Sequence, residues 1–244
     1  MVTESNAMTE AERSERRATI AAEFDAWAPT YESGRLAPWY QMHAREVFSH
    51  LELSKAKRVL DIGCGTGWAL RQLAREHPDI EFHGLDLSSR MIEEARELAV
   101  EEGLSNITFH HGDWELVGPS FARGDYPTIE TGFDLVLALS SLHYMLDLQA
   151  ALVSIRENLY ARGKLVLVER ATQASNLTRI WGAIHKFVLK DGVEFTGTEE
   201  LLAMMRSAGF TEVETLAEKR EVMRYGKLFT SIAVIEGVSV AGGS

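Results

Sequence analysis

The fold is decided by residues 58–67, RVLDIGCGTG, where a short apolar strand runs directly into a loop with glycine at every second position. Glycine has no Cβ, so the chain can turn tightly there and a ligand can approach bare backbone. The pattern therefore predicts a strand, a ligand-binding turn and then a helix. A purely conformational turn remains an alternative, because alternating glycines alone are a weak signal.

Further along the chain, short apolar runs alternate with segments of helical periodicity, which is typical of βαβ units and a parallel sheet. The predicted elements are strands at 58–62, 80–85, 107–110, 133–139 and 164–169, and helices at 68–77, 89–102 and 147–160. Thr198 is a plausible N-cap for a helix that ends at Gly209. Two last strands, about 210–217 and 228–236, suit an antiparallel pair at the sheet edge. We expect a doubly wound, Rossmann-like α/β fold with seven strands.

The chain of 244 residues fits one domain of this class. Residues 1–17 are polar and lack a clear apolar period, so we expect a flexible terminus or a frayed helix. Arg17 and nearby arginines alternate with glutamates, which predicts a solvated helix face. The single domain then covers 18–244, with an N-terminal helical cap at 18–53 and an insertion over the site at 171–197.

Composition excludes several classes of function. The formal net charge of −11 opposes nonspecific binding to a phosphate backbone, so nucleic acid is a disfavoured partner. The single cysteine allows neither an intramolecular disulfide nor a structural zinc site, which favours a reducing cytoplasm. No apolar run approaches the roughly 18 residues that suggest a membrane span, so we expect no membrane insertion.

Three carboxylates follow the first three predicted strands. Asp61 ends the first strand, Asp86 ends the second, 19 residues beyond Gly67, and Asp113 follows the third. The carboxyl ends of parallel strands meet at one edge, where doubly wound folds bind their ligands, and an acidic side chain there can accept hydrogen bonds from ribose. Each carboxylate alone has a cap or solvated-turn alternative, but together they predict a nucleoside site.

These features resemble the class I S-adenosylmethionine-dependent methyltransferases that act on small molecules. Residues 59–67 are similar to the first motif of the family, 84–86 are similar to the second, and the likeness covers about 20–240. It implies S-adenosyl-L-methionine as cofactor and S-adenosyl-L-homocysteine as product. Trp68 stands where a dinucleotide-binding loop would carry its third glycine, which argues against a nicotinamide cofactor.

The resemblance also implies which residues contact the cofactor. They are Asp61, Gly63, Cys64, Gly65, Gly67, Leu139 and Ser140 at its methionine end, Asp86 at the ribose, and Leu87, Met91, Asp113 and Trp114 at the adenine. For Asp61 the resemblance leaves two roles open, orientation of the loop or contact with the methionine amino group. Cys64 occupies a variable slot, and we expect it to be a small packing residue. Residues 24–31 resemble the N-terminal helix of the family, whose tyrosine closes over the cofactor, so Tyr31 is the predicted lid residue.

Methyl transfer from a sulfonium requires alignment of donor and acceptor rather than a covalent enzyme intermediate or a metal. An oxygen acceptor must also lose a proton, and a neutral imidazole suits that task near neutral pH. His143 follows the strand at 133–139, where many small-molecule methyltransferases present a histidine, so it is the candidate catalytic base. A structural, hydrogen-bonded histidine is the alternative.

The acceptor side is less defined. Candidate substrate-binding residues are Tyr144, Glu169, Trp181 and His185, and Arg170 is a weaker candidate for an acidic substrate. Leu139 stands where catechol-type enzymes have an acidic metal ligand, and the strand does not end in the Asn/Asp-Pro-Pro-aromatic signature of nucleic-acid amino methylation.

The remaining prediction is a metal-independent enzyme that methylates oxygen, nitrogen or carbon of a small molecule. One alternative is a noncatalytic module that binds S-adenosylmethionine for regulation, and a lesser one is aminopropyl transfer. The sequence does not identify the acceptor or the oligomeric state.

Overall fold

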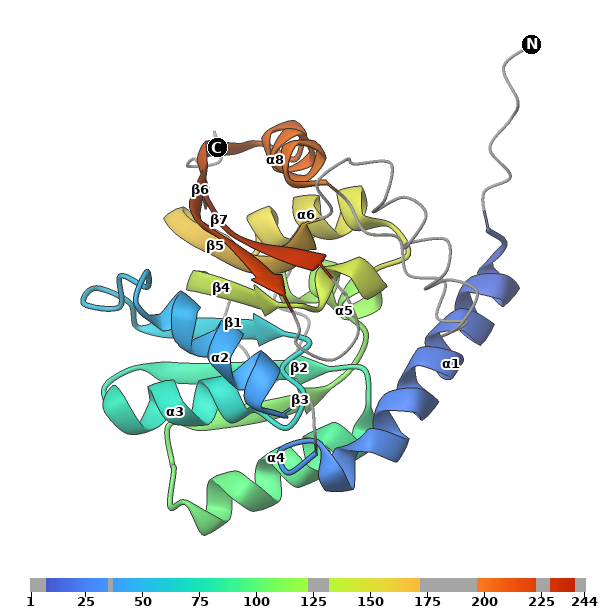
Figure 1. Cartoon of the computed structure of the whole chain (residues 1–244), viewed down its shortest axis with the longest axis vertical. Helices are drawn as coiled ribbons and strands as arrows, with labels where there is room; N and C mark the ends of the chain where they lie inside the picture. The colour runs from blue at the N-terminus through green and yellow to red at the C-terminus, as the bar shows by residue number, and fades with distance from the viewer. Residues whose placement is uncertain (1–7, 35–36, 123–131, 172–196, 223–228, 240–244) are drawn as a thin grey trace.

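The computed structural model of the chain describes residues 8–34, 37–122, 132–171, 197–222 and 229–239. Its centre is a seven-stranded sheet in the order β3-β2-β1-β4-β5-β7-β6 (Figure 1). The strands are β1 Arg58–Ile62, β2 Glu81–Asp86, β3 Ile107–His111, β4 Phe133–Leu139, β5 Leu159–Ala171, β6 Phe210–Val222 and β7 Phe229–Ser239. The first five strands pair in parallel, whereas β7 pairs antiparallel with both β5 and β6. The predicted fold class is confirmed.

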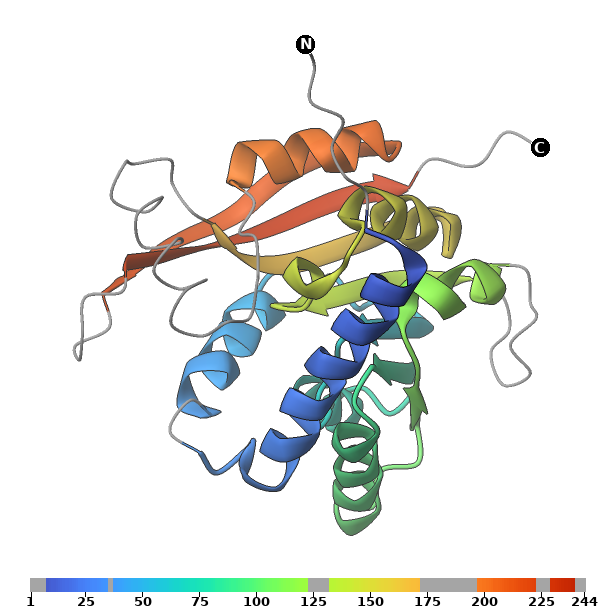
Figure 2. The same ribbon diagram turned by 90° about the vertical axis from the view of Figure 1, so that its right-hand side faces the viewer.

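Helices cover both faces of this sheet (Figures 1 and 2). They are α1 Glu10–Trp27, α2 Ala37–Phe48, α3 Trp68–Glu76, α4 Ser89–Glu101, α5 Trp114–Ala122, α6 Leu148–Glu157 and α8 Thr198–Ser207, with 3-10 turns η1 Ala28–Thr30 and η2 Leu142–Tyr144. The N-cap of α8 is Gly197, so the assignment of Thr198 to that position is wrong. In the described part of the chain, no helix is both long and apolar enough to cross a membrane.

The central strand β1 is buried on both faces because its apolar side chains alternate between two core clusters. Leu60 packs with Leu152 of α6 in one cluster. Val59 packs with Leu70 of α3 in the other. Since each face is covered, ligand access is left to the edge at which the parallel strands end.

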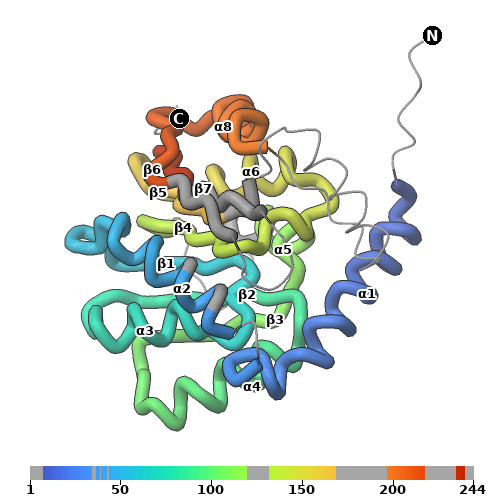
Figure 3. Tube along the Cα trace, in the orientation of Figure 1, coloured from blue at the N-terminus to red at the C-terminus, as the bar shows by residue number. Residues whose placement is uncertain are grey.

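The N-terminal helix α1 crosses this carboxyl edge, and the trace then turns back toward β1 as α2 (Figures 2 and 3). Helix α1 begins at Glu10, where Thr9 and Glu12 form a reciprocal capping box, so residues 10–17 follow the helical alternative of the two expected for this segment. Arg17, however, is not on a solvated face. Its side chain is 13% exposed and pairs with Asp113, which the next section describes.

Candidate functional site

The glycine turn after β1 has a backbone that other residues adopt with strain. Gly63, Gly65 and Gly67 have φ values of 73°, 56° and 74°. A Cβ on Gly63 would lie 2.4 Å from the Cβ of Ser141, and one on Gly67 would lie 2.4 Å from the Phe109 ring. Both conformation and space therefore require glycine at 63 and 67, and the approach of a ligand to the backbone of this turn stays a prediction.

Asp86 ties this turn to the next strand and helix. Its Oδ2 accepts a hydrogen bond from the Gly65 amide at 2.8 Å, and its Oδ1 accepts one from the Ser88 amide at 2.9 Å. Burial raises the pKa of Asp86, and the two amide donors partly oppose that shift. The carboxylate lies at the predicted end of β2, and its contact with a ribose stays a prediction.

Asp61, near the end of β1, has one carboxylate oxygen without a hydrogen bond in the described part of the chain. Its side chain is 2% exposed, and its Oδ1 has no hydrogen-bond partner among the residues that the structure describes. Burial, and then the charge of Asp86, raise the pKa of Asp61 well above its usual range. A buried carboxylate without a donor is costly, and an ammonium group placed against it would remove that cost. The orphaned oxygen thus fits a ligand with an amino group.

The end of β4 closes the other side of the turn. Ser140 has a φ of 59°, rare for a residue with a Cβ, and its amide donates to the Val168 carbonyl at 2.7 Å. If the backbone of Ser140 contacts a ligand amine, the Ser140 carbonyl oxygen would therefore accept that hydrogen bond. Ser141, which the sequence reasoning did not select, donates its hydroxyl to the Ile62 carbonyl at 2.5 Å. Leu139 is half-buried and packs on the core.

Cys64 has the packing role that its size predicts. Its sulfur lies 2.7 Å from where a Cβ on Gly84 would stand, and it packs against the core cluster that contains Leu70. Burial raises the pKa of the Cys64 thiol well above its usual range, so the group stays protonated.

Two residues predicted at the adenine end, Trp114 and Asp113, have contacts within the protein. Trp114 is 2% exposed, packs in the core cluster with Leu152, and its indole N–H lies 3.4 Å from the Ala151 carbonyl. Its ring is therefore a core element, and an adenine contact through the backbone of Trp114 stays a prediction. Asp113 caps α5 by accepting from the Glu115 amide at 3.0 Å.

The second carboxylate oxygen of Asp113 faces the cap. It forms an ion pair with Nε of Arg17 at 2.6 Å, and both side chains are mostly buried. Asp113 therefore joins α1 to the edge of the sheet in addition to any ligand contact. Of the two residues expected to pack the adenine, Met91 is fully buried and Leu87 is half-buried.

Tyr31 lies over the glycine turn. Its ring carbon Cε1 is 3.3 Å from where a Cβ on Gly65 would stand, and its ring stacks on Tyr40 with 4.5 Å between centroids. The Tyr40 hydroxyl donates to the Tyr31 carbonyl. Burial raises the pKa of Tyr31, and Asp86 and Asp61 act in the same direction. The Tyr31 ring therefore lies next to Gly65, and its closure over a cofactor stays a prediction.

The cap also reaches α4 and η2. Asp25 accepts from the Ser88 hydroxyl at 2.5 Å and from the Arg90 amide at 3.1 Å, so α1 is fixed at the start of α4. Phe24 packs edge-to-face on Tyr144, with centroids 5.2 Å apart. Sequence reasoning missed Asp25, although the acidic position within the cap segment was visible.

His143 and Tyr144 share the turn η2 directly after β4, with ring centroids 4.3 Å apart. Both are half-buried, and Tyr144 faces the cap. The structure thus brings them to the carboxyl edge, while the role of His143 as a base stays a prediction. The other substrate-binding predictions cannot join this picture: the side chains of Glu169 and Arg170 and the whole of Trp181 and His185 lie outside the described residues.

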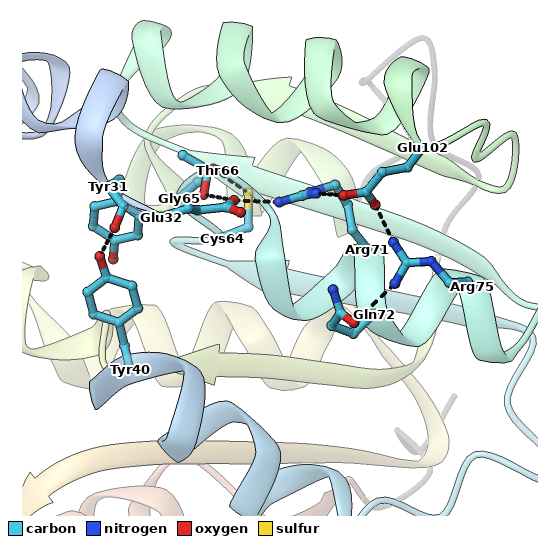
Figure 4. A network of polar contacts seen from close by, with 10 residues as sticks. All are labelled: Tyr31, Glu32, Tyr40, Cys64, Gly65, Thr66, Arg71, Gln72, Arg75 and Glu102. Carbon is cyan, nitrogen blue, oxygen red and sulfur yellow. Dashed lines mark hydrogen bonds and ion pairs between the residues drawn. The ribbon is translucent and has the colours of Figure 1, made fainter. Parts of the chain in front are cut away.

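A polar network beside the glycine turn was also missed (Figure 4). Thr66 donates its hydroxyl to Glu32 at 2.5 Å, Glu32 pairs with Arg71, and Arg71 also pairs with Glu102. The available signal was an arginine on an apolar helix face, because Arg71 stands among the buried residues of α3. Over the described ranges, no group of three or more His, Cys, Asp or Glu side chains could hold a metal ion.

Comparison with known proteins places this geometry in a family. A family profile described as "Methyltransferase domain" matches residues 53–218. Demethylmenaquinone methyltransferase of Geobacillus kaustophilus is 27% identical over 213 residues, which cover 80% of this chain and 86% of that protein. Trans-aconitate 2-methyltransferase of Pseudomonas paraeruginosa is 36% identical over 85 residues, so this chain spans only 30% of its length.

A solved structure agrees on the fold. Magnesium protoporphyrin IX methyltransferase of Synechocystis, determined with bound SAH, matches with a TM-score of 0.67 at 20% identity, over 93% of this chain and 99% of that one. The profile begins just before β1 and ends within β6, so it includes the glycine turn and Asp86. The chain therefore belongs to the class I S-adenosylmethionine-dependent methyltransferase family.

Proposed function

We propose that this protein binds S-adenosyl-L-methionine and transfers its methyl group to a small-molecule acceptor by direct in-line displacement, without a metal ion. The observation that carries the proposal is the buried, unpartnered Oδ1 of Asp61 beside the glycine turn. A carboxylate in this position suits an α-amino group.

Different residues of the chain would bind different parts of the cofactor. Asp61 and the Ser140 carbonyl would receive the amino group, Asp86 would accept hydrogen bonds from the ribose, and Leu87 and Met91 would pack the adenine. The bound cofactor supplies a sulfonium methyl group that a nucleophile can displace. Tyr31 would close over the turn and exclude water from the reacting atoms, which strengthens the electrostatic contacts beneath it.

Catalysis would then depend on positioning and on one proton transfer. Tyr144 and Phe24 present aromatic surface between η2 and the cap, where an acceptor would be held in line. His143 would take the proton of an oxygen or nitrogen acceptor as the new bond forms. The aromatic wall favours an acceptor with a planar apolar part, and the relatives named for demethylmenaquinone and trans-aconitate support a small molecule rather than a macromolecule.

Binding of S-adenosyl-L-homocysteine, measured by calorimetry, tests the cofactor assignment. Asp61→Asn keeps the shape but removes the charge, and we expect it to weaken binding at least tenfold. Asp79→Asn is the matched control, since Asp79 is exposed in the turn between α3 and β2 and should leave affinity unchanged. Equal affinities for Asp61→Asn and the wild type would refute the assignment of the site.

Catalysis needs a separate test, because a noncatalytic module would bind the same ligand. Incubation with methyl-labelled cofactor and a panel of quinols, phenols and small carboxylic acids should give a labelled product with one class of acceptor. Tight binding of the cofactor with no transfer to any acceptor in the panel would favour the regulatory alternative.

A further inference from the structure

The most buried cation in the described chain holds together parts that the glycine turn depends on. Arg71 is 1% exposed, and its guanidinium pairs with Glu32 of the cap through one nitrogen and with Glu102, just after α4, through another (Figure 4). A guanidinium stays charged and can bind two carboxylates in fixed directions, so its position constrains both partners.

The Glu32 end of this arrangement reaches the ligand-binding turn. Glu32 accepts the Thr66 hydroxyl at 2.5 Å on the same oxygen that pairs with Arg71. Thr66 stands between Gly65 and Gly67, and Glu32 directly follows Tyr31. One carboxylate oxygen therefore connects α3, the turn and the lid residue.

Glu102 has different contacts from Glu32. Glu102 pairs with Arg75 at 2.6 Å as well as with Arg71, and it joins α3 to the end of α4, away from the turn. The two carboxylates thus bind the same arginine, but Glu32 contacts the glycine turn and Glu102 pairs with two arginines of α3. Loss of Glu32 would therefore affect the glycine turn, whereas loss of Glu102 would affect only the packing of α3 against α4.

We propose that Arg71 is a positioning residue for cofactor binding: through Glu32 it fixes Thr66 of the glycine turn and holds Tyr31 closed over Gly65. The inference rests on the proposed function. Without this contact the lid and the turn lose their common anchor, so each must be ordered when the cofactor binds. Affinity for the cofactor is the quantity that then falls.

The test compares Glu32→Gln with Glu102→Gln, because each removes one carboxylate from the same arginine. Both variants should melt at a lower temperature than the wild type. Calorimetry with S-adenosyl-L-homocysteine should give at least tenfold weaker binding for Glu32→Gln and a change below twofold for Glu102→Gln. Equal losses of affinity, or none for Glu32→Gln, would overturn the proposal.

Two more measurements separate positioning from general stability. Amide hydrogen exchange without ligand should become faster at 28–34 and 63–67 in Glu32→Gln, and not in Glu102→Gln. Steady-state kinetics should show a higher KM for the cofactor in Glu32→Gln, with kcat changed less than threefold.

The outcomes also distinguish this inference from the function on which it rests. If the wild type fails to bind S-adenosyl-L-homocysteine, the proposed function fails, and unchanged exchange in Glu32→Gln would refute the anchoring role as well. If the wild type binds and Glu32→Gln binds equally well, only the role of Arg71 is refuted. Thr66→Val should match the affinity loss of Glu32→Gln, and the double variant should be no weaker than either alone, since both break one connection.

Discussion

Acid should destabilise this protein through two buried histidines on neighbouring strands. His83 of β2 and His110 of β3 are 1% and 7% exposed, and Nδ1 of His83 lies 3.2 Å from Nε2 of His110. Burial, then the neighbouring His83 and Arg96, lower the pKa of His110 from 6.5 to about 4. Burial also lowers the pKa of His83, against the attraction of Glu81.

The sign follows from proton binding in the two states. Between pH 6.5 and about 4 the unfolded chain carries a proton on His110 that the folded protein does not, so the free energy of unfolding falls as the pH falls through this window. The lowering of the pKa of His110 to about 4 corresponds to a loss of about 3 kcal/mol in the free energy of unfolding once the window is crossed. At pH 5 the loss is about 2 kcal/mol, or roughly 4–8 °C in melting temperature for a domain of this size.

Urea unfolding of the wild type and of His110→Gln at pH 8 and pH 5 measures this contribution. Because many carboxylates also titrate, the quantity to compare is the change between the two pH values. That change should be about 2 kcal/mol smaller in His110→Gln. His50→Gln, in the turn after α2, controls for removal of a half-buried histidine outside the sheet. An identical pH dependence in His110→Gln and the wild type would refute the reasoning.

Two further predictions concern the site. Gly63→Ala should lower the free energy of unfolding by about 2 kcal/mol or more and abolish cofactor binding, whereas Gly103→Ala, with a φ of 69° and nothing within 4 Å of the added Cβ, should lose only about 1 kcal/mol for its backbone. Thermal melts and calorimetry would show this, and equal losses would contradict the steric argument. His143→Ala should lower kcat at least tenfold while cofactor affinity changes less than twofold, and unchanged turnover at neutral pH would make His143 structural.

The strands and helices around the glycine turn were predictable because burial on both faces leaves a strong pattern. β1 and β4 have the predicted bounds, and α3 and α4 differ by one residue at one end. α5 was missed because Gly118 and Pro119 lie within it, and both residues ordinarily interrupt a helical pattern. The burial of the Trp114 ring was missed for a related reason, since the first turn of that unpredicted helix directs its ring into the core.

The carboxylates of the site were predictable from their places after the strands, but the contacts of the cap were not. Arg17 and Asp113 lie 96 residues apart in the sequence, and their pairing depends on how α1 crosses the sheet edge. Charge alternation alone gave Arg17 a solvated position, because a short pattern contains no information about a partner that distant. The ion pairs of Arg71 were not predicted for the same reason, because both carboxylates that it binds come from other elements.

The crossing of α1 over the carboxyl edge has a practical consequence for anyone who shortens the chain. Hydropathy alone places the start of the folded unit at residue 18, and a protein trimmed there would still contain every strand. It would lose Thr9, the first two turns of α1 and Arg17, and with them the partner of Asp113. Such a trimmed protein would keep the sheet and yet leave the Asp113 carboxylate at the carboxyl edge without its arginine and open to water.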